Sequence, residues 1–371
     1  MSARFAESDA LHRRVRAIVH AFEQGETAEP FDDVARDLAR FQCKSIAGYA
    51  RLCAARGIAP ASIARACDAP AVPTDAFKIA AVFAFDPRDA SFTFRTSGTT
   101  IGMRGTHAMR DIGTYDAGAL AFGRAMLMDD LTLPVPMLVV GPSEEEAPDS
   151  SLAHMCSLFV RAFGSHFPSE QTFFARGGAL DLDGLRARVE RLHDYGASIV
   201  LATSFALVHL LERLDGHVLA LPSRSRVMQT GGFKGRSREV DARALREDIA
   251  RAFAIEARDV VCEYGMTEIS SQFWEGTAVD SQALHGVYRE PPWARVVPVD
   301  PETLVPVADG EIGIARIEDL ANVDSAFAVL AADRVRRTHG GFELLGRARG
   351  AVPRGCSISL DEMLSREQPP S

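Results

Sequence analysis

One stretch rich in hydroxyls and glycines decides how the rest of the chain is interpreted: Phe94-Arg95-Thr96-Ser97-Gly98-Thr99-Thr100-Ile101-Gly102-Met103-Arg104-Gly105-Thr106. It follows a strand-like segment, residues 91–94, and carries a basic residue near its end. Glycine lets backbone N–H groups turn toward one point, and Ser or Thr hydroxyls add donors beside them. The stretch therefore predicts a phosphate-binding loop, with a polar surface turn as the alternative. It is not a Walker A loop, because no Gly-Lys-Ser/Thr sequence closes it.

Length and composition are those of an ordinary globular protein. The 371 residues, 47% of them hydrophobic, suffice for a full core and two or three subdomains. No apolar run approaches the ~20 residues of a membrane span, and charges replace the apolar core of a signal peptide near the N-terminus. We therefore expect a cytoplasmic protein that does not engage a membrane. The net charge of −9 argues against a nucleic-acid partner. The six cysteines lack the spacing of zinc ligands or of a disulfide framework.

Helical periodicity dominates the N-terminal region, which we assign to residues 1–80. Apolar residues recur at helical spacing over residues 9–22 and again over residues 31–53, and residues 59–69 look like a further short helix. Residues 82–94 then predict a strand, a turn, and the strand that delivers the loop.

Strand and helix patterns alternate in the middle of the chain, which argues for an α/β fold with mostly parallel sheets flanked by helices. We assign this core to residues 81–280. Buried strands are expected at residues 137–140, 197–202, 226–230 and 259–263. Helices are expected at residues 114–128, 152–163, 182–195, 205–214 and 240–253. In such sheets a ligand binds at the carboxyl ends of the strands.

The pattern changes beyond residue 281. Short strands separated by turns predict a small β-rich subdomain over residues 281–360, in which residues 326–333 are expected to be a connection. The polar, Pro-containing end, residues 361–371, is expected to be a disordered tail.

The second informative motif follows a predicted strand and reads Glu263-Tyr264-Gly265-Met266-Thr267-Glu268. Tyr264 can stack on a purine, and Gly265 lets the backbone approach a ligand. Thr267 can hydrogen-bond a phosphate, and Glu268 can bind the Mg²⁺ that bridges phosphates. The alternative is a strand end with a buried tyrosine. Gly231-Gly232 could form the other wall of a purine slot.

Together these motifs resemble the ordered core motifs of the adenylate-forming superfamily, which contains acyl-CoA synthetases, peptide-synthetase adenylation domains and firefly luciferase. The matching segments, in the family's order, are Thr96-Ser97-Gly98-Thr99-Thr100 with Gly105, Tyr264-Gly265-Met266-Thr267-Glu268, Gly310-Glu311-Ile312-Gly313 and Gly346-Arg347. The resemblance implies that ATP and a carboxylic acid substrate give an acyl-adenylate and pyrophosphate, with Mg²⁺ as the second cofactor.

The same resemblance implies roles for individual residues. The loop of residues 96–105 handles the β- and γ-phosphates, Tyr264 lies against adenine, and Thr267 contacts the α-phosphate. Glu268 holds Mg²⁺, and Asp333 stands where the family has the aspartate that binds the ribose hydroxyls. Attack of a carboxylate on the α-phosphorus brings two anions together, so catalysis must come from positioning and charge neutralisation.

The chain also departs from the family's pattern. Ile101 stands where the loop usually has Gly, Met103 where it has Pro, and Arg104 where it has Lys. Arg104 keeps the charge but reaches phosphate with a planar fork. The sequence ends soon after Arg347, so we expect the usual mobile C-terminal domain, with its catalytic lysine, to be absent.

This shorter chain resembles the LuxE-like acyl-protein synthetases, as do Gln229-Thr230-Gly231-Gly232-Phe233-Lys234-Gly235 and the ending at residues 346–357. In that group a cysteine near the C-terminus accepts the acyl group and passes it to a reductase partner. Cys356 stands at the matching place, and neighbouring cations would raise its thiolate fraction. The alternative to the acyl-acceptor role is an ordinary thiol. Lys234 either replaces the missing lysine or is a surface charge. Arg347 either contacts ribose or phosphate or is a salt-bridged hinge.

Three functions follow as hypotheses. The leading one is an ATP-dependent acid ligase that transfers the acyl group to a thiol, either Cys356 or that of an acyl-acceptor protein. The second is a compact ligase that hands the acyl group directly to coenzyme A, a carrier protein, or a small-molecule amine or hydroxyl. The third is a non-catalytic nucleotide-binding scaffold, against which the joint presence of Tyr264, Thr267, Glu268 and Asp333 argues. The sequence does not identify the acid.

Overall fold

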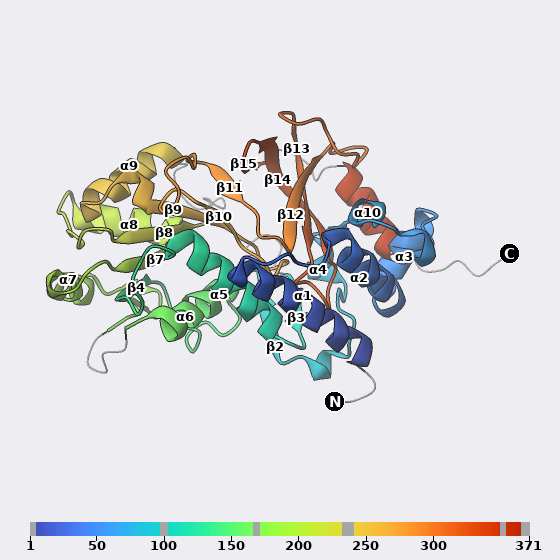
Figure 1. Cartoon of the computed structure of the whole chain (residues 1–371), viewed down its shortest axis with the longest axis horizontal. Coiled ribbons are helices and arrows are strands. Elements are labelled where there is room, and N and C mark those ends of the chain that lie inside the picture. Colours follow the sequence, from blue (N-terminus) through green and yellow to red (C-terminus); the bar gives the residue numbers. More distant parts are fainter. Residues whose placement is uncertain (1–4, 97–102, 166–170, 232–240, 349–353, 365–371) are drawn as a thin grey trace. The chain divides into compact units, whose positions relative to one another are not determined.

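A computed structural model describes residues 5–96, 103–165, 171–231, 241–348 and 354–364 (Figure 1). The chain forms two compact units, each assembled from separated stretches of sequence. The first unit takes residues 1–121, 266–271 and 290–371, and the second takes residues 122–265 and 272–289. The ranges predicted from the sequence are contiguous, whereas both of these units are interrupted in the chain.

A parallel sheet forms the centre of the second unit, which confirms the predicted α/β class with mostly parallel strands. The parallel strands, in spatial order, are β4 (Met137–Val140), β7 (Ile199–Thr203), β8 (Arg226–Thr230) and β9 (Val260–Tyr264). Two antiparallel strands, β10 (Phe273–Glu275) and β11 (Val287–Arg289), continue the sheet beyond β9. A separate small hairpin pairs β5 (Ala175–Arg176) with β6 (Ala179–Leu180).

Helices cover this sheet, and in several of them an N-cap side chain accepts a backbone N–H group of the first turn. The helices are α6 (Ser151–Phe163), α7 (Leu182–Glu190), α8 (Ser204–Leu214) and α9 (Ala242–Phe253). The Thr203 hydroxyl accepts the Ala206 N–H at 3.0 Å at the start of α8, so the helix begins directly where β7 ends. Alternate strand residues such as Leu138, Val200 and Val227 are buried in one core with the leucines of α7, α8 and α9. Burial on both faces explains why β4 and most of β7 are continuous apolar runs.

An antiparallel sheet and a group of helices form the first unit. Its helices are α1 (Ala6–Gln24), α2 (Phe31–Ser45), α3 (Ala47–Ala55), α4 (Ala76–Ile79) and α10 (Arg354–Leu364), and α5 (Gly113–Leu127) leads from this unit into the second. The sheet strands, in order, are β12 (Ala294–Val299), β13 (Ile312–Asp319), β14 (Ala328–Thr338) and β15 (Gly341–Arg347), and β1 (Val72–Pro73) pairs parallel with β14. A hairpin joins β2 (Phe92–Arg95) to β3 (Thr106–Met109).

Several local predictions were wrong. Residues 82–85 form no strand, only a single bridge between Phe83 and Ser325. Residues 59–69 contain two short 3-10 turns, because Asp68 accepts the N–H groups of Ala64 and Arg65 and so competes with helix formation. Residues 328–333 belong to β14, whose first four residues are all buried, and not to a connection. The α10 helix includes residues 361–364, which the sequence pattern assigns to the tail.

No helix in the part of the chain that the structure describes has the length and apolar composition needed to cross a membrane.

Candidate functional site

The candidate phosphate loop lies between β2 and β3 in the sequence. The residues at its two ends, Thr96 and Gly105, are hydrogen-bonded to each other. The Thr96 N–H donates to the Gly105 carbonyl at 2.9 Å, and the Gly105 N–H donates to the Thr96 hydroxyl at 2.8 Å. A Cβ at Gly105 would lie 3.0 Å from the Thr96 methyl carbon, so the close approach favours glycine. The Arg104 guanidinium donates to the carbonyl oxygens of Thr96, at 2.7 Å, and Arg95, at 3.2 Å. Thr96 and Arg104 therefore define the base of the loop.

His107, on β3 just beyond the loop, connects this hairpin to the second motif. Its side chain is 2% exposed, and Nδ1 lies 2.7 Å from the Thr267 carbonyl oxygen. A carbonyl can only accept, so Nδ1 carries the proton. Burial lowers the pKa of His107 to about 4, so the ring is neutral near pH 7. The backbone at Thr267 is thereby fixed relative to the strand that carries the loop.

The buried carboxylate of Asp319 holds the residues that follow the second motif. It accepts the backbone N–H groups of Ser270 and Ser271, both at 2.8 Å, and the Ser271 hydroxyl at 2.7 Å. The Ala321 N–H adds a fourth donor at 3.0 Å. Four donors to one carboxylate compensate for its complete burial, so this segment has one defined conformation.

Asn322 fixes the Glu268 backbone from the same side. Its amide nitrogen donates to the carbonyl oxygens of Glu268, at 3.0 Å, and Ala326, at 2.9 Å. Its amide oxygen accepts the Ser270 hydroxyl at 2.7 Å. Thr267 and Glu268 are thus adjacent residues whose carbonyls are both held by buried side chains, and the Glu268 side chain is itself 7% exposed.

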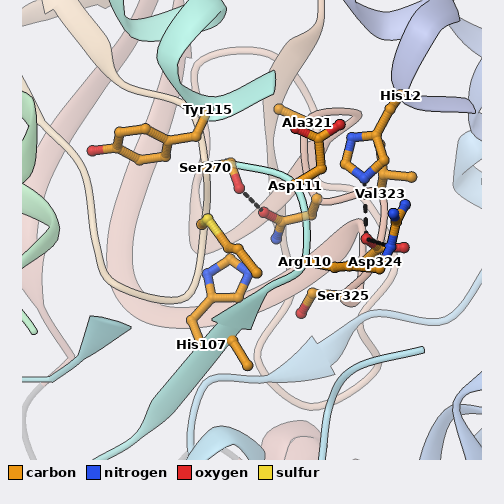
Figure 2. A pocket seen from close by; sticks show the side chains of 13 residues that line it. His12, His107, Arg110, Asp111, Tyr115, Ser270, Ala321, Val323, Asp324 and Ser325 are labelled. Carbon is orange, nitrogen blue, oxygen red and sulfur yellow. Dashed lines mark hydrogen bonds and ion pairs between the residues drawn. The ribbon is translucent and has the colours of Figure 1, made fainter. Parts of the chain in front are cut away.

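A small polar cavity lies among these residues (Figure 2). His12 and Arg110 both point toward Asp324, with His12 Nε2 at 3.1 Å and Arg110 Nε at 3.2 Å from its carboxylate. The cavity volume is about 10 Å³, which is room for about one water molecule. The cavity is therefore too small to hold a nucleotide.

The two residues expected near ribose lie opposite each other on neighbouring strands. Asp333 on β14 pairs in register with Arg347 on β15, and Arg347 Nε is 3.4 Å from the Asp333 carboxylate. The Arg347 side chain is 62% exposed, whereas that of Asp333 is 14% exposed. The arginine can therefore reach a ligand while it stays beside the carboxylate.

In the second unit, polar residues line the carboxyl ends of the parallel strands. The strand register aligns Thr203 with Thr230 and Thr230 with Glu263 across β7, β8 and β9. The Thr230 hydroxyl donates to the Glu263 carboxylate. Gln229 donates through its amide nitrogen to the Ser204 hydroxyl oxygen at 3.0 Å. This is the edge of a parallel sheet at which ligands usually bind.

Tyr264 ends β9 and is packed within the second unit. Its ring is 8% exposed, stacks on Phe273 with centroids 6.0 Å apart, and meets Tyr288 edge-on at 6.1 Å. Gly265 follows it, and a Cβ there would lie 2.6 Å from Glu263 Oε1. The absence of a side chain at residue 265 thus makes room for the Glu263 carboxyl group. Gly231, exposed at the end of β8, has a left-handed φ of 78°.

Cys356 lies in the first turn of α10, a helix that packs on α3. The Gly355 N–H donates to the Pro301 carbonyl at 3.0 Å. At the other end of the helix, Arg51 of α3 donates to the Met363 carbonyl at 2.7 Å, and Arg56, directly after α3, donates to the Glu362 carboxylate at 2.9 Å. The helix that carries the predicted acyl acceptor therefore has a defined docking position in the first unit.

Part of the predicted site lies outside the described residues: Ser97, Gly98, Thr99, Thr100, Gly232 and Lys234. Within the described residues, no group of three or more His, Cys, Asp or Glu side chains could hold a metal ion by itself. A single carboxylate such as Glu268 nevertheless fits Mg²⁺ that takes its other ligands from phosphates and water.

Sequence reasoning missed four residues that the structure makes prominent: His107, Glu263, Asp319 and Asn322. Glu263 could have been noticed, because it is a charged residue at the end of an otherwise apolar strand. His107 lies two residues after the loop but belongs to no recognisable motif. Asp319 and Asn322 reach residues 268–271 only through the fold, so the sequence contains no local signal for them.

The family model described as "Acyl-protein synthetase, LuxE" matches residues 26–365 of this chain. A curated relative named long-chain-fatty-acid–luciferin-component ligase, from Vibrio harveyi, is 22% identical over 309 residues, which cover 80% of this chain and 78% of the relative. The ligase of the same name from Aliivibrio fischeri is 21% identical over 313 residues, covering 80% of this chain and 79% of the relative.

Solved structures show the same fold. A 2-hydroxyisobutyryl-CoA ligase in complex with 2-HIB-AMP, in its postadenylation state, matches with a TM-score of 0.60 and 14% identity over 85% of this chain and 67% of that chain. Its complex with 2-HIB-AMP and CoA matches with a TM-score of 0.58 and 15% identity over 90% and 68%. ATP-bound MatB from Rhodopseudomonas palustris has a TM-score of 0.48 and 16% identity over 71% of this chain, which spans about half, 49%, of MatB. The two ligase complexes identify the core fold of adenylate-forming enzymes.

Proposed function

Because this chain belongs to the LuxE acyl-protein synthetase family, we propose that it activates a carboxylic acid with ATP and transfers the acyl group to a thiol. The acid oxygen attacks the α-phosphorus, pyrophosphate leaves, and an acyl-adenylate forms. The thiolate then attacks the acyl carbon and AMP leaves. The observation that carries this proposal is the fixed backbone at Thr267 and Glu268, held by His107 at 2.7 Å and Asn322 at 3.0 Å.

The rigid backbone matters because the reaction joins two anions. A carboxylate approaching the α-phosphate is repelled unless donors and cations already stand in place. Thr267 is the candidate donor to the α-phosphate, and Arg104 is the candidate cation at the base of the loop. Bound Mg²⁺, with Glu268 as its protein ligand, would neutralise phosphate charge as the pyrophosphate leaves.

We assign the nucleotide contacts by the same logic. Tyr264 and Gly231 lie at the ends of neighbouring strands and are candidates for the adenine, while Asp333 and Arg347 are candidates for the ribose and phosphate. Thr96 and the hydroxyls of Ser97, Thr99 and Thr100 are candidates for the β- and γ-phosphates. Lys234 is the candidate for a further cation at the phosphates.

Cys356 is the candidate acyl acceptor. The first turn of a helix favours a thiolate, because unpaired backbone N–H groups place partial positive charge there. The thioester would then pass to a second thiol or a partner protein. The curated relatives are named for long-chain fatty acids, so such acids belong in the first substrate panel.

The test is to incubate the purified protein with ATP, Mg²⁺ and a carboxylic acid library, and to follow pyrophosphate release and intact protein mass. We expect pyrophosphate with at least one acid, together with an acyl mass adduct that hydroxylamine removes. Cys356→Ser should lose the adduct and keep the pyrophosphate. Cys67→Ser is the matched control, because Cys67 is an exposed thiol in the same unit.

Other outcomes separate the alternatives. An adenylate without any protein adduct, and with acyl-CoA formed when coenzyme A is added, would identify a compact ligase with an external acceptor. Nucleotide binding without pyrophosphate from any acid would reject the enzymatic proposal and leave a nucleotide-binding scaffold.

A further inference from the structure

Glu263 has fewer donors than three other buried carboxyl groups, those of Glu275, Asp319 and Asp324. Glu275 accepts from Arg246 at 2.8 Å and from the Cys262 N–H at 3.1 Å. Asp319 has four donors, and Asp324 has a histidine and an arginine. Glu263 is 5% exposed, and among the described residues its one hydrogen bond comes from the Thr230 hydroxyl.

The surroundings of Glu263 contribute no compensating cation within the described part of the chain. Burial raises the pKa of Cys156 of α6 and of Tyr288 of β11, and the Glu263 charge adds to both shifts. Both are acids, so neither can neutralise a carboxylate. Burial of Glu263 raises its own pKa to about 7, whereas the Thr230 hydrogen bond acts in the opposite direction.

A second acceptor at the same strand ends also lacks a donor. Gln229, one residue before Thr230 on β8, is 7% exposed, and its amide oxygen has no hydrogen-bond partner among the described residues. Buried polar groups in folded proteins are nearly always hydrogen-bonded, so an unmatched acceptor needs an explanation. The Gln229 side chain points to the opposite face of the sheet from those of Thr230 and Glu263, because successive strand residues alternate between the two faces. The need for a ligand donor is therefore inferred from Glu263 alone, a buried carboxyl group at the carboxyl edge of a parallel sheet with one donor among the described residues.

Gly265 supports this arrangement. A side chain at residue 265 would begin 2.6 Å from Glu263 Oε1, so glycine allows the carboxyl group to occupy this position at the end of β9. The carboxyl oxygen that Thr230 does not hold therefore lies against the backbone of the proposed adenylate-binding motif.

We propose that Glu263, held by Thr230, recognises a hydrogen-bond donor, either a hydroxyl or a protonated amine, on the acid that the enzyme activates. This inference rests on the proposed function and names its substrate class. An acid with only an alkyl chain would leave the buried carboxyl group without a donor, and a site built for a hydrogen bond rejects an analogue that lacks it. We expect discrimination of about 100-fold in kcat/KM between a hydroxy or amino acid and its unsubstituted counterpart, the order that one unsatisfied buried acceptor costs.

The test uses the full chain and matched acids. Butyrate, hexanoate, octanoate and palmitate are each compared with counterparts that carry a hydroxyl or an amino group at the alpha, beta or terminal carbon. ATP-dependent pyrophosphate release gives kcat and KM for each acid. Glu263→Gln keeps the shape but removes the negative charge, Thr230→Val removes the hydroxyl that holds it, and Glu212→Gln is the control, because that side chain is 73% exposed in the same unit.

The wild type should favour one substituted acid, and both site variants should lower kcat/KM for it at least about tenfold with little change for the alkyl acid. Glu212→Gln should keep the wild-type ranking. Equal activation of substituted and unsubstituted acids by the wild type would overturn the inference while the proposed function stands. Pyrophosphate from no acid would instead reject the proposed function itself. If Glu263→Gln does not fold, the wild-type ranking and Thr230→Val decide the question.

Discussion

Asp319 in the first unit and Glu263 in the second are both buried carboxyl groups beside the same motif, yet their surroundings differ. Asp319 is 0% exposed and has four donors, which together fix residues 270 and 271. Glu263 is 5% exposed and has one donor among the described residues. A buried carboxylate with all its hydrogen bonds satisfied stabilises a backbone conformation, whereas one with an open oxygen is suited to a ligand.

The number of donors distinguishes buried side chains that support the backbone from those that can recognise a ligand. His107, Asp319 and Asn322 use their hydrogen-bonding capacity on backbone atoms of residues 267–271, so a substrate has little to gain from them. Glu263 and Gln229 retain accepting capacity at the strand ends. Variants of the first group should therefore change stability most, and variants of the second group should change substrate choice and pH dependence.

The largest effect should come from Asp319→Ala. The variant leaves four buried donors without their acceptor, so we expect a loss of about 4 kcal/mol in the free energy of unfolding. Urea unfolding followed by circular dichroism measures it. Glu263→Ala, which removes the acceptor of one hydroxyl, should cost clearly less, and equal losses in the two variants would contradict the comparison.

The pH dependence of Glu263 should follow next. Its folded pKa, about 7, lies above the ordinary value of 4.5, so between these values the folded state binds a proton that the unfolded state lacks. The free energy of unfolding should therefore fall as pH rises, by about 2.5 kcal/mol from this group between about pH 5 and pH 7.5. Unfolding of the wild type and Glu263→Gln across this range tests it. A constant difference between the two proteins would show that the carboxyl group has no raised pKa.

His107 should show the opposite sign. Its folded pKa, about 4, lies below the ordinary value of 6.5, so its contribution is present above pH 6.5 and is lost as the pH falls. We expect about 2 kcal/mol to be lost between about pH 6.5 and pH 5. His107→Asn, which retains a side-chain N–H donor but does not titrate, should lose less stability over the same interval. If the two proteins respond to acid identically, His107 is not the group responsible.

Arg347→Ala should have the smallest effect on stability. The Arg347–Asp333 pair is solvent-exposed on the arginine side, so its removal should cost no more than about 0.5 kcal/mol. If Arg347 contacts the nucleotide, the KM for ATP should rise several-fold in the pyrophosphate assay. Arg336→Ala is the matched control, because Arg336 forms a similar pair with Glu343 on the same two strands. An unchanged KM for ATP would restrict Arg347 to the salt bridge.

The sequence by itself determined the parallel sheet, and the phosphate-binding role of the loop stays a prediction from the sequence. The four buried strands expected at residues 137–140, 197–202, 226–230 and 259–263 each became a parallel strand, because their apolar residues are buried between helices. The run of hydroxyls and glycines at residues 94–106 can also be recognised from the sequence, because its residues are contiguous in the chain. Cys356 and Lys234 were singled out through the resemblance to a family, and their roles stay predictions.

Only the tertiary structure decided which polar residues support the motif and which remain open to a ligand. Asp319 and Asn322 are about 50 residues from Ser270 in the sequence, and His107 is 160 residues from Thr267. No periodicity or spacing connects such pairs, because hydrogen bonds between distant segments depend on how the chain folds back on itself. The same holds for Glu263: its charge is visible in the sequence, but its burial and its single donor are consequences of packing.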